Sequence, residues 1–217
     1  MRIADLRPSD KVPGRWLCFL DDGSLLRLGE GEVVRFGLYA GLELEDDQLA
    51  QILDAAGESR VRERALALLA ARPMSRRELI DKLTAPRGGG KREPAATPEQ
   101  AARAADRLEE LGYLDDGAYA RLVAERCAAR GYGERRVRDE LFRRGVPREH
   151  WDGALEGLSG PEAGIDEFLR RKLGDGPADR DSLRRAANAL ARRGYRWEEI
   201  QAGLRRYGGE IEEDSAF

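Results

Sequence analysis

Few residues in this chain of 217 could take part in acid–base, nucleophilic or metal chemistry. It has one histidine, His150, beside Trp151 at the start of an expected helix, and two cysteines, Cys18 and Cys127, far apart in sequence. A zinc site needs a cluster of cysteine and histidine ligands, and His150 has no cysteine pair near it. His150 could in principle act as a base, but a surface or capping role is the simpler interpretation. Both cysteines are expected to be small buried apolar side chains without a disulfide framework.

Two further motifs have explanations simpler than catalysis. Arg87–Lys91 reads RGGGK, but it lacks the G-x-x-x-x-G-K-[ST] spacing of a phosphate-binding loop and no strand precedes it, so we interpret it as a linker. The pairs Asp21–Asp22 and Asp115–Asp116 stand where a turn and a helix start are expected, and capping explains both. The sequence therefore indicates no catalytic residue, no metal site and no cofactor, and an enzyme is the least favoured class.

The charge distribution favours a binding function in the middle of the chain. Charged residues make up 36% of the sequence, yet the net charge is only −3, so the local balance matters more than the total. That balance is −6 over residues 1–59, +5 over 60–100, +1 over 101–150 and −3 over 151–217. Almost all the basic residues are arginines, which make paired contacts with carboxylates and phosphates.

Arginines crowd two consecutive expected helices between residues 115 and 145. Steps of seven and eight residues separate Arg136 from Arg143 and Arg144, so these three fall near one side of a helix. Such a stripe suits an acidic protein groove or a phosphate backbone, although a solvated surface interleaved with acidic residues explains it equally well. The candidate partner-binding residues are Arg121, Arg126, Arg130, Arg135, Arg136, Arg138, Arg143 and Arg144.

The elements that would position these residues differ between the two ends of the chain. Residues 15–20 and 24–28 are apolar runs around Asp-Asp-Gly, the pattern of a β-hairpin, and residues 32–36 could add a third short strand or a turn. Residues 46–53 predict a helix with acids in its first turn. From residue 60 onward the apolar residues follow a helical period, and residues 86–96 form a Gly/Pro-rich loop.

The helical part carries an internal repeat. Counted from Gly145, apolar residues lie at positions −4, +1, +6, +10 and +13, and the same positions counted from Gly194 are apolar too. These matched residues are Leu141, Val146, Trp151, Leu155 and Leu158 in one unit and Leu190, Tyr195, Ile200, Leu204 and Tyr207 in the next. An earlier unit fits if Leu79 and Leu108 match Leu141 and Leu155, with extra residues in the 86–96 loop. Self-similarity of this kind is typical of helical repeat proteins, although chance matches in a generic helical bundle remain the alternative.

We therefore predict a mainly α protein. Three tandem three-helix repeats would form an elongated array, with a small N-terminal β-hairpin extension. The predicted divisions are an extension of hairpin and helix at 1–57, repeats at 58–114, 115–159 and 160–208, and an acidic tail at 209–217.

Several segments of the chain resemble RecX regulatory proteins. Residues 108–120, LEELGYLDDGAYA, resemble the family's L-x-x-x-G-Y-L-(N/D)-D-x-x-(F/Y)-A core. Arg126 with residues 131–141, GYGERRVRDEL, is similar to its R…G-x-G-x-x-(R)-(I/V)-x-x-E-L segment, and 144–146 match its (K/R)-G-(I/V). The family's opening unit is matched by residues 64–69, Ser75, Glu78 and Leu79. The resemblance covers about residues 60–207 and is strongest from 108 to 146; it departs from the family at the 86–96 loop and at the acidic N-terminal segment, which only some members have.

The resemblance implies a function. RecX-like proteins bind along the groove of the RecA–DNA filament and bridge neighbouring protomers. They restrain its ATPase, strand-exchange and co-protease activities, and so moderate recombination and the SOS response. In this chain the chief contacts to the filament or to DNA are expected from Arg126, Arg135, Arg136 and Arg143. The family's glycines and apolar residues are expected to be structural, with core positions at Leu108, Leu111, Tyr113, Tyr119 and Leu141.

Other functional classes stay open. A helix-turn-helix-like protein could bind DNA through the basic middle repeat without RecA, and an adaptor for another protein would affect neither. The sequence has no apolar run after Met1 and none long enough to cross a bilayer, so we expect a cytoplasmic protein that does not contact membranes. A monomer is the default, because a repeat array needs no partner to complete its core.

Overall fold

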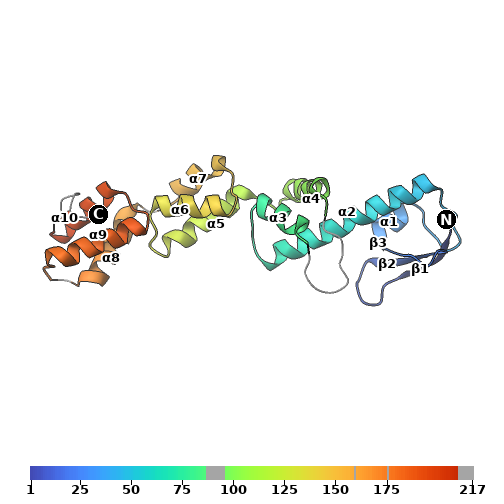
Figure 1. Ribbon diagram of the computed structural model, residues 1–217, viewed down its shortest axis with the longest axis horizontal. Coiled ribbons are helices and arrows are strands. Elements are labelled where there is room, and N and C mark those ends of the chain that lie inside the picture. The colour runs from blue at the N-terminus through green and yellow to red at the C-terminus, as the bar shows by residue number, and fades with distance from the viewer. Residues whose placement is uncertain (87–95, 159, 175, 210–217) are drawn as a thin grey trace. The chain divides into compact units, whose positions relative to one another are not determined.

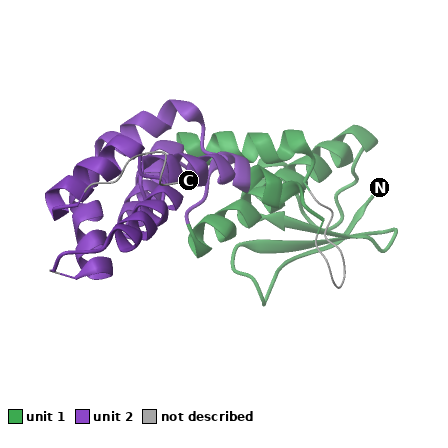
Figure 2. Cartoon of the chain, turned by 60° about the vertical axis from the view of Figure 1, so that its left-hand side comes forward, with its two compact units in different colours: residues 1–72, 79–113 green, residues 73–78, 114–217 purple. Residues whose placement is uncertain are grey.

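The computed structural model describes residues 1–86, 96–158, 160–174 and 176–209 (Figure 1). The predicted fold class is confirmed: the chain is mainly helical, with a small antiparallel sheet at its N-terminus. It divides into two compact units, Met1–Arg72 with Leu79–Tyr113, and Pro73–Glu78 with Leu114–Phe217 (Figure 2). Among the described residues no helix is long and apolar enough to cross a membrane. Most of the 86–96 loop and of the acidic tail lies outside the described residues.

The N-terminal sheet contains the predicted hairpin and one strand more. Strands β1 (Ile3–Pro8), β2 (Arg15–Leu20) and β3 (Leu25–Gly29) are antiparallel in that order. The hairpin is β2–β3, with Phe19 opposite Leu25 and the turn closed at Gly23, whose φ is +84°. Sequence analysis missed β1 because only Ile3 in it is fully buried, so it lacks the alternation that marks a half-buried strand.

The expected third strand or turn at residues 32–36 is wrong. This segment belongs to helix α1 (Glu30–Arg35), although the β-branched pair Val33–Val34 favours a strand. The Glu32 carboxylate accepts a hydrogen bond of 2.7 Å from the Gly29 backbone N–H, and this local cap fixes the helix start. Val34 points outward with 75% of its surface exposed, so no sheet face requires it.

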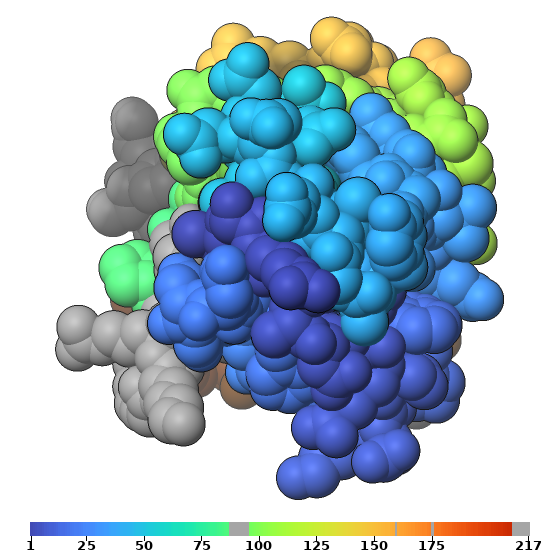
Figure 3. All heavy atoms as spheres, turned by 90° about the vertical axis from the view of Figure 1, so that its right-hand side faces the viewer, coloured from blue at the N-terminus to red at the C-terminus, as the bar shows by residue number. Residues whose placement is uncertain are grey.

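Helix α2 (Asp46–Ala71) belongs to two packed regions of the first unit. Its first turns cover the sheet through Ile52 and Ala56, which join a core with Ile3, Leu20 and Leu28. Figure 3 shows this end, where the strands in dark blue and the start of α2 in lighter blue form one continuous surface. The later turns of α2 pack on α4 (Pro98–Glu110). The predicted division at residue 57 therefore falls inside one unbroken helix.

The C-terminal half of α2 also fixes helix α3 (Arg76–Thr84). The Arg64 guanidinium donates hydrogen bonds of 2.6 and 3.0 Å to the carbonyls of Lys82 and Leu83, at the end of α3 where backbone acceptors lack partners. Helix α4 begins at the expected capping box, with Thr97 Oγ1 accepting from the Gln100 N–H at 3.2 Å.

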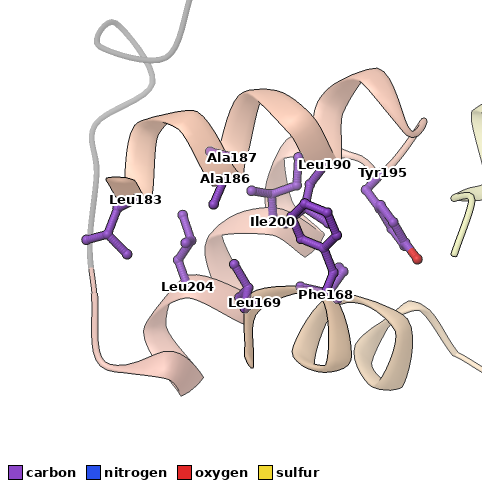
Figure 4. Close-up of a cluster of buried hydrophobic side chains, with 10 residues drawn as sticks. Phe168, Leu169, Leu183, Ala186, Ala187, Leu190, Tyr195, Ile200 and Leu204 are labelled. Atoms are coloured by element: carbon purple, nitrogen blue, oxygen red, sulfur yellow. The ribbon is translucent and has the colours of Figure 1, made fainter. Parts of the chain in front are cut away.

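The second unit contains two three-helix groups, each with its own core. The first comprises α5 (Asp116–Ala128), α6 (Glu134–Arg143), a 3₁₀ turn (Arg148–His150) and α7 (Trp151–Glu156). The second comprises α8 (Pro161–Leu173), α9 (Arg180–Arg192) and α10 (Trp197–Tyr207), whose buried side chains are shown in Figure 4. Residues matched by the repeat counted from Gly145 and Gly194 occupy equivalent places: Leu141 and Leu190 are both fully buried.

Two expected core residues are on the surface. Leu111 is 49% exposed and Tyr113 is 64% exposed, because both lie where α4 has ended and the chain turns at Gly112 with a φ of +75°. Leu114 is buried in their place. Cys18 and Cys127 are buried and free, as predicted. His150 stands at the N-cap of α7 but makes no side-chain capping hydrogen bond, and its ring is partly exposed, so of the two expected roles the structure favours the surface position.

Candidate partner-binding surface

Helices α5 and α6 present their arginines because their other faces are used for packing. Tyr119, Val123 and Cys127 of α5 and Val137 and Leu141 of α6 are buried in one core. The Asp115 carboxylate caps α5 by accepting from the Ala118 N–H at 2.8 Å. The eight candidate arginines lie on or just after these two helices, and none of them is buried.

Five of those arginines surround one pocket of about 300 Å³, called here the arginine pocket. It is lined by Arg126, Arg130, Arg136, Arg143 and Arg144, together with Val123, Cys127, Tyr132 and Glu140. The predicted side of α6 with Arg136, Arg143 and Arg144 is one wall, and residues of α5 and the following turn form the other. The structure thus brings together arginines that are up to 18 positions apart.

Contacts hold part of the arginine pocket in a fixed arrangement. Glu140 is the one acidic residue among those that line it, and its carboxylate accepts from both Arg143 and Arg144. Arg144 also donates to the Tyr119 hydroxyl at 2.9 Å. Burial lowers the pKa of Arg144, but the hydrogen bonds with Tyr119 and Glu140 outweigh it and raise that pKa above its usual value. The Arg136 guanidinium lies 5.8 Å from the centre of the Tyr132 ring, a cation–π contact.

A second depression of about 540 Å³, the α6–α9 groove, lies beside the first. Its lining comprises Arg135, Arg136, Asp139, Asn188, Ala191, Arg192 and Gly194. Arg136 lines both depressions, so they form one arginine surface on the second unit. The sequence analysis missed Arg192, although the internal repeat gave a signal. Arg192 lies two residues before Gly194, as Arg143 lies two residues before Gly145.

Two of the eight candidates lie apart from this surface. Arg138 forms ion pairs with Glu134 at 2.8 Å and Asp152 at 2.9 Å, and the hydrogen bond that it donates to Glu134 raises its pKa above the usual value. It links α6 to the start of α7, which is a structural task. Arg121 is exposed on α5 and lines neither the arginine pocket nor the α6–α9 groove.

Backbone hydrogen bonds join the start of α6 to the C-terminal end of α9 within the second unit. The Gly133 N–H donates to the Arg193 carbonyl at 2.9 Å, and the Arg135 N–H to the Gly194 carbonyl at 3.2 Å. An equivalent junction precedes it, where the Ser75 hydroxyl donates to the Arg144 carbonyl at 2.5 Å. At each junction the donor lies just before a helix and the acceptor is the carbonyl of the residue before a glycine turn. Gly133 precedes α6 and donates to Arg193, before Gly194; Ser75 precedes α3 and donates to Arg144, before Gly145. Within the second unit this contact brings Arg135 and Arg136 of α6 near Arg192 of α9.

The Asp116 carboxyl gives the earlier junction a pH dependence. The Asp116 side chain is buried and accepts a hydrogen bond of 2.8 Å from the backbone N–H of Arg76. Burial raises its pKa above the ordinary value more than this hydrogen bond lowers it. Because the folded pKa is raised, its contribution to stability is complete below the ordinary aspartate pKa and is lost as the pH rises through the folded pKa.

We therefore expect Asp116→Asn to be more stable than the parent chain at pH 7, with a difference that closes as the pH falls below about 4. The asparagine keeps an oxygen acceptor for Arg76 without burying a charge. The measurement is the free energy of unfolding in urea at several pH values. A loss of stability that is equal at every pH would show that the charge of Asp116 is compensated in the folded chain.

The fold is that of a helical-repeat protein with an arginine-rich surface, and comparisons with known proteins identify its family. The family model "RecX, second three-helix domain" matches residues 115–155. "Regulatory protein RecX" of Xanthomonas axonopodis pv. citri (strain 306) is 38% identical over 145 residues, which is 66% of this chain and 85% of that protein. The protein of the same name from Stenotrophomonas maltophilia (strain R551-3) is 37% identical over 66% of this chain and 84% of its own length. The chain belongs to the RecX family.

Solved structures agree on the fold. "Crystal structure of regulatory protein RecX" superposes with a TM-score of 0.71 at 20% identity and covers 93% of this chain and 98% of that one. The structure of RecX from Lactobacillus salivarius gives a TM-score of 0.58 at 16% identity, over 71% of this chain and 98% of that one. The relatives are named as regulatory proteins.

Proposed function

We propose that this chain regulates recombination by binding the RecA–DNA filament and inhibiting its ATPase, strand-exchange and co-protease activities, without catalysis of its own. The observation that carries the proposal is membership of the RecX family over 145 aligned residues. The chain would act as a monomer in the cytoplasm, where it would moderate the SOS response.

The arginine surface supports a contact with an acidic partner. Arginine side chains in two adjoining depressions can each make paired hydrogen bonds to carboxylates or phosphates. The proposed chief contacts are Arg126, Arg135, Arg136 and Arg143. Arg138 is bound by two acidic residues and Arg121 lies apart, so we give these two candidates lesser roles.

The test is the DNA-dependent ATPase of the cognate RecA, with this protein added at ratios well below one molecule per protomer. We expect strong inhibition, and we expect Arg135→Ala with Arg136→Ala to require at least about tenfold more protein, since central interface arginines often contribute more than 1 kcal/mol each. The matched control is Arg170→Ala with Arg171→Ala, which removes two exposed arginines from α8. Absence of inhibition by excess parent protein would contradict the proposal.

A second candidate, DNA binding without RecA, is favoured by the α6–α9 groove. It combines Arg135, Arg136 and Arg192 with the side-chain amide of Asn188, a group that can bond both phosphates and base edges. This function requires tight binding to duplex oligonucleotides in the absence of RecA, with an affinity that falls steeply as salt increases. Weak binding of DNA that does not depend on its base sequence, together with inhibition of the RecA ATPase, would favour the filament regulator.

A further inference from the structure

We infer that the arginine pocket is a binding site for a free phosphate-type anion, with inorganic pyrophosphate as the better ligand and orthophosphate as the weaker. This inference goes beyond the proposed function and does not depend on it. The first support is the size of the pocket, about 300 Å³, which lies at the lower limit for small-ligand sites and fits a compact anion.

The second support is an excess of positive charge. Five guanidinium groups line the pocket, and its single carboxylate among the described residues, Glu140, is already shared by Arg143 and Arg144. Arg126, Arg130 and Arg136 make no ion pair with any residue in the described parts of the chain. Like charges held this close repel one another, so an anion that enters the pocket relieves the repulsion.

The third support is that three of the five arginines are held in place before any ligand arrives. Glu140 holds Arg143 and Arg144, the Tyr119 hydroxyl holds Arg144 a second time, and the Tyr132 ring holds Arg136. A guanidinium fixed in this way loses little conformational freedom when it binds an oxyanion. Arg126 and Arg130 are exposed and can close over the ligand from α5 and its C-terminal turn.

The number of donors favours a free phosphate over the other anions available to a protein. A side-chain carboxylate offers one charge and two oxygens, which two of these arginines saturate. A phosphodiester in nucleic acid also carries a single charge. Pyrophosphate offers several charges and more oxygens in one small molecule, so it can use more of the pocket's donors than a carboxylate or a single phosphodiester can.

The occupied pocket would also affect the neighbouring groove. Arg136 lines both depressions, so an anion that binds it in the pocket withdraws one guanidinium from the α6–α9 groove. A free phosphate compound would thereby weaken the binding of any acidic partner that uses the α6–α9 groove. This gives the chain a means of responding to the concentration of such compounds.

The experiment is isothermal titration of the full chain with sodium pyrophosphate at constant ionic strength, with sodium sulfate and a single-stranded oligonucleotide titrated in parallel. We expect saturable 1:1 binding of pyrophosphate, weaker binding of sulfate, and a rise in melting temperature with pyrophosphate. Arg126→Ala with Arg130→Ala is expected to lower the affinity for pyrophosphate at least about tenfold, since two charge-assisted donors are lost. Neither arginine packs in the core, so the variant is expected to fold.

The control is Arg121→Ala, which removes one exposed arginine of the same helix α5 and should leave the affinity unchanged. A milder variant, Arg130→Gln, keeps the length of the side chain and tests the charge alone. Equal affinity of pyrophosphate for the parent chain and the double variant would overturn the site. So would binding of the oligonucleotide without binding of pyrophosphate, which would assign the arginines to nucleic acid instead.

Discussion

Replacement of Gly194 by alanine is expected to lower the free energy of unfolding by about 3 kcal/mol, because overpacking adds to left-handed backbone strain. Gly194 has a φ of +90°, and a Cβ atom there would lie 2.5 Å from the backbone nitrogen of Arg136. Backbone cannot rotate away as a side chain can, so α6 and α9 would have to separate. Their separation would break the hydrogen bonds from Gly133 and Arg135.

The control for this prediction is Gly208→Ala. Gly208 ends α10 with a φ of +95°, but a Cβ atom there would meet nothing within 4 Å. This variant reports the backbone strain alone, about 1–2 kcal/mol. Urea unfolding followed by circular dichroism measures both variants. If Gly194→Ala and Gly208→Ala lowered the free energy of unfolding equally, the contact between Gly194 and Arg136 would adjust to the added methyl group without loss of stability.

The second large effect is expected from Leu141→Ala, which should lower the free energy of unfolding by about 3 kcal/mol, as buried leucine truncations do. Leu141 is fully buried between α5 and α7, in contact with the core that includes Val123, Val137 and Trp151. Removing its side chain leaves a cavity under the helix that carries Arg136 and Arg143.

The neighbouring residue supplies a matched control for Leu141. Phe142 follows it in α6 and is 63% exposed, so Phe142→Ala should change the stability by less than about 0.5 kcal/mol. The same unfolding measurement compares the two. A large loss from Phe142→Ala would show that this ring is covered in solution, most simply by another molecule.

The helical part of the fold could be predicted because its signals are local and repeated. Caps such as Thr97 and Asp115 mark helix starts through a single hydrogen bond to a residue three positions on. Glycines at positive φ mark helix ends, and the register from Gly145 to Gly194 places Leu141 and Leu190 alike. These features depend on a few neighbouring residues, so the sequence alone reveals them.

The missed features depend on contacts between distant segments. Strand β1 has little pattern of its own and forms because β2 offers it a free edge. The two valines of α1 favour a strand, and one hydrogen bond from Gly29 to Glu32 decides otherwise. Leu111 and Tyr113 have the apolar character of core residues, but the turn at Gly112 directs them to solvent.

The candidate site was predictable as a set of residue types but not as a pocket. Helical spacing placed Arg136, Arg143 and Arg144 together, yet it could not show that Arg126 and Arg130 approach them from α5. It could not show that acidic residues neutralise Arg138 either. Both facts follow from how α5, α6 and α7 pack, which no single-helix pattern contains.

The unbroken course of α2 limits how modular this protein is. Its first turns complete the core of the sheet and its later turns complete the first helical group, so neither can be exchanged without the other. A shortened chain that begins after residue 57 would start in mid-helix, without the acidic first turn at Asp46 and Asp47 that stabilises the helix start. The sheet and the first helical group therefore share one helix, whereas α8–α10 enclose a core of their own and meet the preceding group mainly through hydrogen bonds at the end of α9.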